Sequence, residues 1–151
     1  MSDLIHFEDI EVGQTHRFGG YEVTAAEIVA YARQFDPQPF HVDEEAARRS
    51  HFGGLIASGW HTGAMLMRMV CESAIPGHAT NGAVGFDDLK WLKPVRPGDV
   101  LSVENVVVEK VESRSRRDIG VVKIGGRVLN QSGDAVLSLT SLVLYRRRSG
   151  A

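Results

Sequence analysis

Asp36 and His41 are the two residues of this chain whose types and spacing best suit acid–base chemistry. They belong to the stretch Asp36-Pro37-Gln38-Pro39-Phe40-His41-Val42-Asp43. Proline fixes its own φ and pushes the preceding residue out of the helical region, so the stretch is predicted to be a stiff, extended loop. Such a loop can hold a carboxylate and an imidazole facing one small volume, as acid–base catalysis requires. The structural alternative is that Asp36 caps one element, Asp43 starts the next and His41 lies on the surface.

Helices are predicted on both sides of this loop. Thr24 and Glu27 have the spacing of a capping box, and the residues after them repeat apolar side chains at helical spacing. Pro37 ends that helix, which places Asp36 just past its C-terminal end. Asp43 can cap a second, short helix that runs through residues 44–48.

A long helix is expected over residues 59–75, after the glycine-rich approach Phe52-Gly53-Gly54-Leu55-Ile56-Ala57-Ser58-Gly59. Apolar side chains cover most of its circumference, and this pattern is typical of a helix buried in the core. Cys71, the single cysteine, lies in this helix and is expected to be a small buried hydrophobic residue.

The chain outside these helices has β character, so the fold class is predicted to be α+β. Strands are expected over residues 14–23 and 82–93, along alternating apolar residues from 101 to 111, over 119–130, and from 137 to 145. Short turns between the last four strands indicate an antiparallel meander. About five strands must wrap the long helix in one domain, residues 1–151. The open sheet edge predicts a homodimer, or a higher oligomer.

Composition excludes several function classes. The net charge of −2 gives no sign of a nucleic-acid partner. There is no apolar run of about 18 residues, so neither a transmembrane helix nor a membrane partner is expected. No secretory signal opens the chain, and a cytoplasmic protein is the expectation.

The order of elements and two motifs resemble the hotdog fold and, within it, the MaoC-like dehydratases, which include the (R)-specific enoyl-CoA hydratases. The motifs are the stretches from Asp36 to Asp43 and from Phe52 to Gly59, supported by Leu92-Lys93-Pro94-Val95-Arg96-Pro97-Gly98-Asp99. Gln38 stands where many of these hydratases have Asn, and Ser58 where they often have His. Both differences bear on the substrate more than on the chemistry.

The resemblance implies a hydro-lyase that adds water to, or removes it from, the 2,3 double bond of an enoyl thioester. Asp36 and His41 would carry the reaction, and the Gly59 amide, beside Ser58, would receive the thioester oxygen. The start of a helix suits this role, because its N–H groups are free and the helix dipole is positive there. No cofactor and no metal are expected, since CoA enters as part of the substrate.

The partner implied is an acyl thioester of CoA or of acyl carrier protein, giving an (R)-3-hydroxyacyl product. Further candidates for binding it are Phe52, Trp60, Lys90, Lys93 and Arg96. A hotdog thioesterase is an alternative, although Glu72 lies about four helical turns from Gly59. A non-catalytic acyl-CoA-binding subunit is another, but it would need no Asp–His pair.

Overall fold

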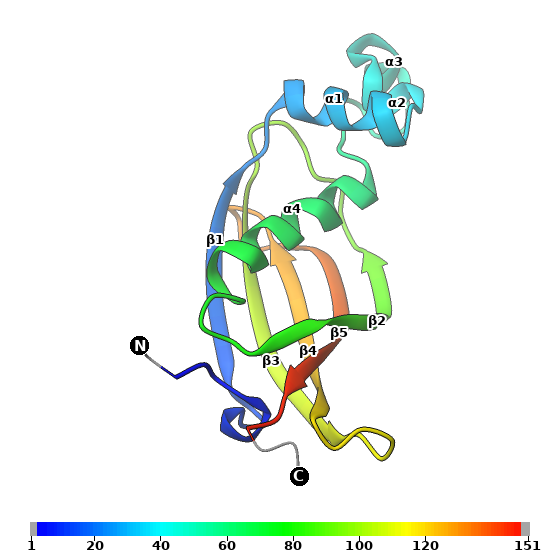
Figure 1. Cartoon of the computed structure of the whole chain (residues 1–151). Coiled ribbons are helices and arrows are strands. Elements are labelled where there is room, and N and C mark those ends of the chain that lie inside the picture. The colour runs from blue at the N-terminus through cyan, green and yellow to red at the C-terminus, as the bar shows by residue number, and fades with distance from the viewer. Residues whose placement is uncertain (1–2, 149–151) are drawn as a thin grey trace.

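A five-stranded antiparallel sheet curves around one long helix in this protein (Figure 1). The computed structural model describes residues 3–148. The sheet order is β1-β3-β4-β5-β2. The strands are β1 (Thr15–Glu22), β2 (Thr80–Trp91), β3 (Val100–Glu112), β4 (Ile119–Leu129) and β5 (Ala135–Arg146). This arrangement confirms the predicted α+β class and the sheet of about five strands around one helix.

The position of β2 differs from the predicted meander. Strands β3, β4 and β5 follow one another as hairpins, but β2 pairs with β5 at the far edge of the sheet. Both edges of β3 are already occupied, by β1 on one side and β4 on the other. The free edge of β5 is therefore the place where β2 completes the sheet.

Residues 3–148 contain four α-helices and one short 3₁₀-helix. These are α1 (Ala25–Phe35), α2 (Pro39–Val42), α3 (Glu44–Arg49), α4 (Gly59–Ser73) and the 3₁₀-helix η1 (Phe7–Asp9). The predicted N-cap residues Thr24 and Asp43 are confirmed, but the capping box is not complete, because the Glu27 carboxylate accepts a hydrogen bond from the Tyr21 hydroxyl instead of reaching back. The Thr24 hydroxyl accepts a hydrogen bond from the Glu27 amide at 3.2 Å. The Asp43 carboxylate accepts from the amides of Glu45 and Ala46 at 2.9 and 3.1 Å. None of the helices described is long and apolar enough to cross a membrane.

The predicted extended loop between Asp36 and Asp43 is wrong in one respect, because α2 makes a helical turn there. Pro39 takes the first position of α2, where a missing N–H costs nothing and the fixed φ suits a helix. Gln38, the residue before it, stays extended with ψ at 146°. The stretch is a compact corner, and it turns His41 back toward Asp36.

One face of α4 forms the centre of the core. Met65 and Met69 are almost fully buried there and pack with Leu101, Val103 and further residues of the sheet. Residues 3–148 leave the opposite face of α4 uncovered, since Met67 is about half exposed and Cys71 is exposed. The predictions that α4 is buried nearly all round and that Cys71 is buried are therefore wrong. A wrapped sheet covers one side of a helix and leaves the other open (Figure 1).

Candidate active site

Asp36 and His41 face each other across the corner between α1 and α2. Asp36 is the C-cap of α1, and its amide donates to the Ala32 carbonyl at 2.8 Å. His41 Nε2 lies 3.3 Å from Asp36 Oδ2. The His41 side chain is buried, with the residue 4% exposed, so the alternative that placed it on the surface is wrong.

A backbone carbonyl decides which nitrogen of His41 carries the proton. Nδ1 lies 2.7 Å from the carbonyl oxygen of Ile56. A carbonyl oxygen can only accept a hydrogen bond, so Nδ1 is the donor. In the neutral ring Nε2 then has no proton and points its lone pair toward Asp36. Two proton acceptors therefore face the same small volume, which suits the binding and activation of one water molecule.

The surroundings of Asp36 favour its ionised form. Burial acts to raise the pKa of this carboxyl, but the nearby polar side chains of Ser58 and Gln38, and the charge of His41 whenever its ring is protonated, outweigh it and lower the pKa. The Gln38 amide donates to Asp36 Oδ1 at 2.6 Å. Asp36 is thus a carboxylate at neutral pH, with one oxygen held by Gln38 and the other turned to His41.

Helix α4 begins beside this pair without a side-chain cap. Ser58 is its N-cap residue and is fully buried, yet its hydroxyl does not cap the helix. That hydroxyl makes no hydrogen bond within residues 3–148. The first N–H groups of α4 are therefore open to a ligand.

An aromatic pair lies over the start of α4. A Cβ atom added to Gly59 would come within 2.5 Å of the Trp91 ring, so the indole rests directly on the glycine. Trp60 meets Trp91 edge-on, with ring centroids 5.2 Å apart. Both indoles are substantially exposed. A ligand that reaches the Gly59 amide would therefore pass these rings.

A family comparison accounts for this arrangement. The family model described as the MaoC like domain matches residues 8–130, most of the chain. The chain belongs to the MaoC-like family. Its five-stranded sheet wrapped around α4 is accordingly the hotdog fold, as the sequence predicted.

Similar proteins carry hydratase and dehydratase names. The MaoC-like dehydratase of Rhodospirillum rubrum is 45% identical, with a TM-score of 0.88 over 96% of this chain and 99% of that one. The 3-hydroxybutyryl-CoA dehydratase of Methylorubrum extorquens is 32% identical over 90% of this chain and 85% of that protein. The R-hydratase PhaJ1 of Pseudomonas aeruginosa is 26% identical, with a TM-score of 0.75 over 97% of this chain and 88% of that one.

The further candidates for binding the acyl thioester do not lie together in this MaoC-like chain. Arg96 donates to the Phe52 carbonyl at 2.5 Å, and so ties down the loop before α4. Lys93 forms an ion pair with Asp134 at 3.0 Å. The Phe52 ring packs against Phe40, the neighbour of His41, with centroids 5.2 Å apart. Among these further candidates, Trp60 lies beside the contact between Gly59 and Trp91.

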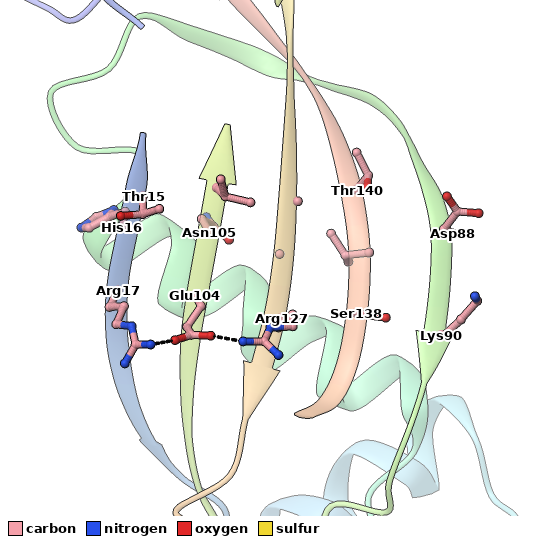
Figure 2. A pocket seen from close by; sticks show the side chains of 14 residues that line it. Thr15, His16, Arg17, Asp88, Lys90, Glu104, Asn105, Arg127, Ser138 and Thr140 are labelled. Carbon is pink, nitrogen blue, oxygen red and sulfur yellow. Dashed lines mark hydrogen bonds and ion pairs between the residues drawn. The ribbon is translucent and has the colours of Figure 1, made fainter. Parts of the chain in front are cut away.

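Lys90 lies on the outer face of the sheet, opposite its neighbour Trp91. It lines a hollow of about 730 Å³. Figure 2 shows this hollow on the face of the sheet that is turned away from α4. A row of side chains crosses all five strands there in register: Arg17, Glu104, Arg127, Ser138 and Lys90. Glu104 forms ion pairs with both arginines. The row depends on strand pairing, and no local pattern in the sequence predicted it.

From its place near the start of the long helix, His61 is expected to make only local hydrogen bonds. The structure contradicts this expectation. His61 is buried, stacks on Tyr31 of α1 and has no hydrogen-bond partner at Nδ1 among the described residues. The sequence around His61 gives no indication of the contact with Tyr31, because Tyr31 lies 30 positions earlier in the chain.

Proposed function

We propose that this protein hydrates the 2,3 double bond of an enoyl thioester, or dehydrates the product, with an enoyl-CoA and an (R)-3-hydroxyacyl-CoA as the two partners. The observation that carries this proposal is the buried Asp36–His41 pair beside the uncapped start of α4. The relatives named as hydratases and dehydratases support the reaction class, and the 3-hydroxybutyryl-CoA dehydratase supports CoA as the carrier.

The catalytic pair would hold one water molecule between Asp36 Oδ2 and His41 Nε2. As the water oxygen bonds to C3 of the enoyl group, the pair takes a proton from the water and delivers one to C2. The Ile56 carbonyl holds the His41 ring in place and keeps Nδ1 protonated throughout. Gln38 holds the other oxygen of Asp36, so that the carboxylate cannot rotate away.

The start of α4 would stabilise the charge that builds on the thioester oxygen during addition. The N–H of Gly59 points outward from the helix end, where the helix dipole is positive. Glycine at this position lets the thioester approach the backbone closely, with the Trp91 ring against it. The acyl carrier would extend outward past Trp60. No cofactor takes part in these steps.

A thioesterase would need a polar group at the thioester. Glu72, the carboxylate of α4, lies at the far end of the helix and pairs with Arg68 at 2.5 Å. The position of Glu72 therefore gives no support to a thioesterase.

Two substrates, crotonyl-CoA and its saturated analogue butyryl-CoA, distinguish a hydratase from a thioesterase and from a non-catalytic binding module. A hydratase causes loss of the enoyl absorbance of crotonyl-CoA and leaves butyryl-CoA unchanged. Release of free thiol from either substrate would identify a thioesterase instead. Binding of both without turnover would identify a non-catalytic module, and either of these results would overturn the proposal.

A further inference from the structure

A second polar cluster lies between α1 and α4, on the flank of the helix that carries Asp36 at its end. Glu27 and Tyr31 of α1, Tyr21 of β1, and His61 and Arg68 of α4 line a groove of about 640 Å³. His61 is 3% exposed and lies two residues after Gly59. A buried imidazole so close to the proposed thioester site calls for a physical explanation, because burying a polar group is costly unless its contacts offset the loss of water.

His61 makes two contacts with α1. Its ring stacks on Tyr31, with centroids 4.5 Å apart and planes 8° from parallel. Its Nε2 lies 3.9 Å from Glu27 Oε1, one helical turn earlier on the same side of α1. The Glu27 carboxylate in turn accepts a hydrogen bond from the Tyr21 hydroxyl of β1. One side chain of α4 is thus held by two consecutive turns of α1 and, through Glu27, by the sheet.

These contacts join the two elements that must be aligned for the proposed reaction. Helix α1 ends at Phe35, so any rotation or slide of α1 moves the Asp36 carboxylate. Helix α4 begins at Gly59, so its first turn carries the free N–H groups. His61 lies in that first turn. His41 is held separately, through the Ile56 carbonyl.

We propose that His61 is a positioning residue: through Tyr31 and Glu27 it holds α1, and with it the Asp36 carboxylate, at a fixed place relative to the N–H groups that begin α4. This inference rests on the proposed hydratase function. Ile28 and Met65 still join α1 and α4 in the common core without His61. Loss of His61 therefore loosens the alignment without removing the packing that folds the two helices together.

The expected effect falls on the chemical step. A misplacement of about 1 Å in a catalytic group can cost about 100-fold in rate. His61→Leu is expected to lower kcat on crotonyl-CoA by about 10- to 100-fold and to leave KM within about threefold, because the carrier does not touch the α1–α4 groove. Tyr31→Leu breaks the same contact from the other helix, so it should reproduce the loss. The double variant should be little worse than the poorer single variant.

His78→Leu is the matched control. His78 also pairs with a tyrosine, since its Nδ1 lies 2.9 Å from the Tyr145 hydroxyl, but this pair lies where the N-terminal segment meets the last strand. The melting temperature should fall for His61→Leu and for His78→Leu alike, while kcat falls for His61→Leu alone. Equal kcat in the two variants would show that His61 is structural and would overturn the proposal.

A second readout does not depend on activity. Polar neighbours that include Ser58, at the start of α4, lower the pKa of Asp36, at the end of α1. The titration of Asp36 therefore reports the alignment of the two helices. In His61→Leu and Tyr31→Leu the titration of the ¹³C-labelled Asp36 carboxyl, followed by NMR, should move up toward the ordinary aspartate range. Should His61→Leu not fold, the titration of Asp36 in Tyr31→Leu decides this readout, because that variant breaks the same contact from α1.

The two readouts separate failure of this inference from failure of the proposed function. If the native protein turns over no enoyl-CoA, the function is wrong, yet the Asp36 titration still decides whether His61 aligns the helices. If kcat falls while the Asp36 titration stays in place, His61 acts by another route and the inference is wrong.

Discussion

At the scale of single residues, the geometry of the Asp36–His41 corner depends on which polar atoms donate and which accept hydrogen bonds. The Ile56 carbonyl obliges His41 Nδ1 to keep its proton, and the Gln38 amide holds one oxygen of Asp36. The remaining oxygen and nitrogen, 3.3 Å apart, are both left as acceptors. Ile28, Met65 and Leu101 make the packing between α1, α4 and the sheet without Asp36 or His41, although His41 is itself buried and its loss should cost some stability.

Replacing either member of the pair should therefore remove activity and spare the fold. Asp36→Asn and His41→Ala are each expected to lower kcat/KM on an enoyl-CoA by about 10²- to 10⁴-fold, because each contributes proton transfer to the same water. Circular dichroism should remain that of the native protein. A single variant that keeps more than about a tenth of the activity would show that the pair is not the catalytic centre.

Gly59 and Gly63 provide a matched pair of substitutions on one helix. Gly59→Ala places a methyl group 2.5 Å from the Trp91 ring and narrows the approach to the first N–H of α4. We expect at least about a tenfold loss of kcat/KM, consistent with the loss of an oxyanion contact. Gly63→Ala meets no atom within 4 Å and should raise stability by up to about 1 kcal/mol with activity kept. Equal activity in the two variants would contradict the assigned role of Gly59.

At the scale of elements, the contact between α1 and α4 depends on a neutral imidazole. Burial lowers the pKa of His61, and the nearby Glu27 carboxylate opposes this only in part. The other polar groups lining this groove are Tyr31 and Gln34 on α1, Tyr21 on β1, and Arg68 and Glu72 on α4. A histidine whose pKa is lower in the folded than in the unfolded protein is more readily protonated when unfolded.

This difference predicts a pH dependence of stability. As the pH falls below about 6.5, the ordinary histidine value, the unfolded chain takes up a proton that His61 in the folded protein resists. The free energy of unfolding should therefore fall from pH 7 toward pH 5. Melting temperatures measured across this range should decline less steeply for His61→Leu than for the native protein. His78, whose pKa is also lowered by burial, contributes a similar slope that remains in this variant. Parallel slopes in the two proteins would contradict the prediction.

At the scale of the whole molecule, β2 and α4 leave an apolar surface on one side. Val84 and Phe86 of the edge strand β2 are more than half exposed, as is Trp60, and Met67 is nearly so. An open edge strand with apolar side chains is commonly closed by a second copy of the chain, which extends the sheet across the interface. The relative positions of β2 and α4 would let one partner cover both.

We therefore predict a homodimer joined through β2. Light scattering at micromolar concentration should give twice the 16.5 kDa of one chain. Phe86→Lys should shift the mass toward the monomer, because a lysine on an edge strand opposes pairing. Val108→Lys, on the outer face of the internal strand β3, should leave the dimer intact. A native protein of monomer mass would contradict this prediction.

The sequence by itself determined the local features of this protein. Thr24, Asp43 and Pro39 set helix starts through hydrogen bonds and a fixed φ that involve only the next few residues, so the pattern of residue types is sufficient. The apolar repeat after Gly59 likewise predicted α4. The motif from Asp36 to Asp43 placed a carboxylate and an imidazole close together along the chain, and the resemblance it carries predicted the hotdog fold.

The tertiary structure alone decided the contacts between distant segments. Strand β2 lies beside β5 because that edge was free, and Lys90 consequently joins the row of Arg17, Glu104 and Arg127. The tautomer of His41 depends on a carbonyl 15 positions away, and the burial of His61 on a tyrosine 30 positions earlier. Such contacts depend on which surfaces remain uncovered once the sheet has curved around α4. Local residue types do not determine these contacts. Each segment can pair or pack in several places until the other segments have taken up their positions.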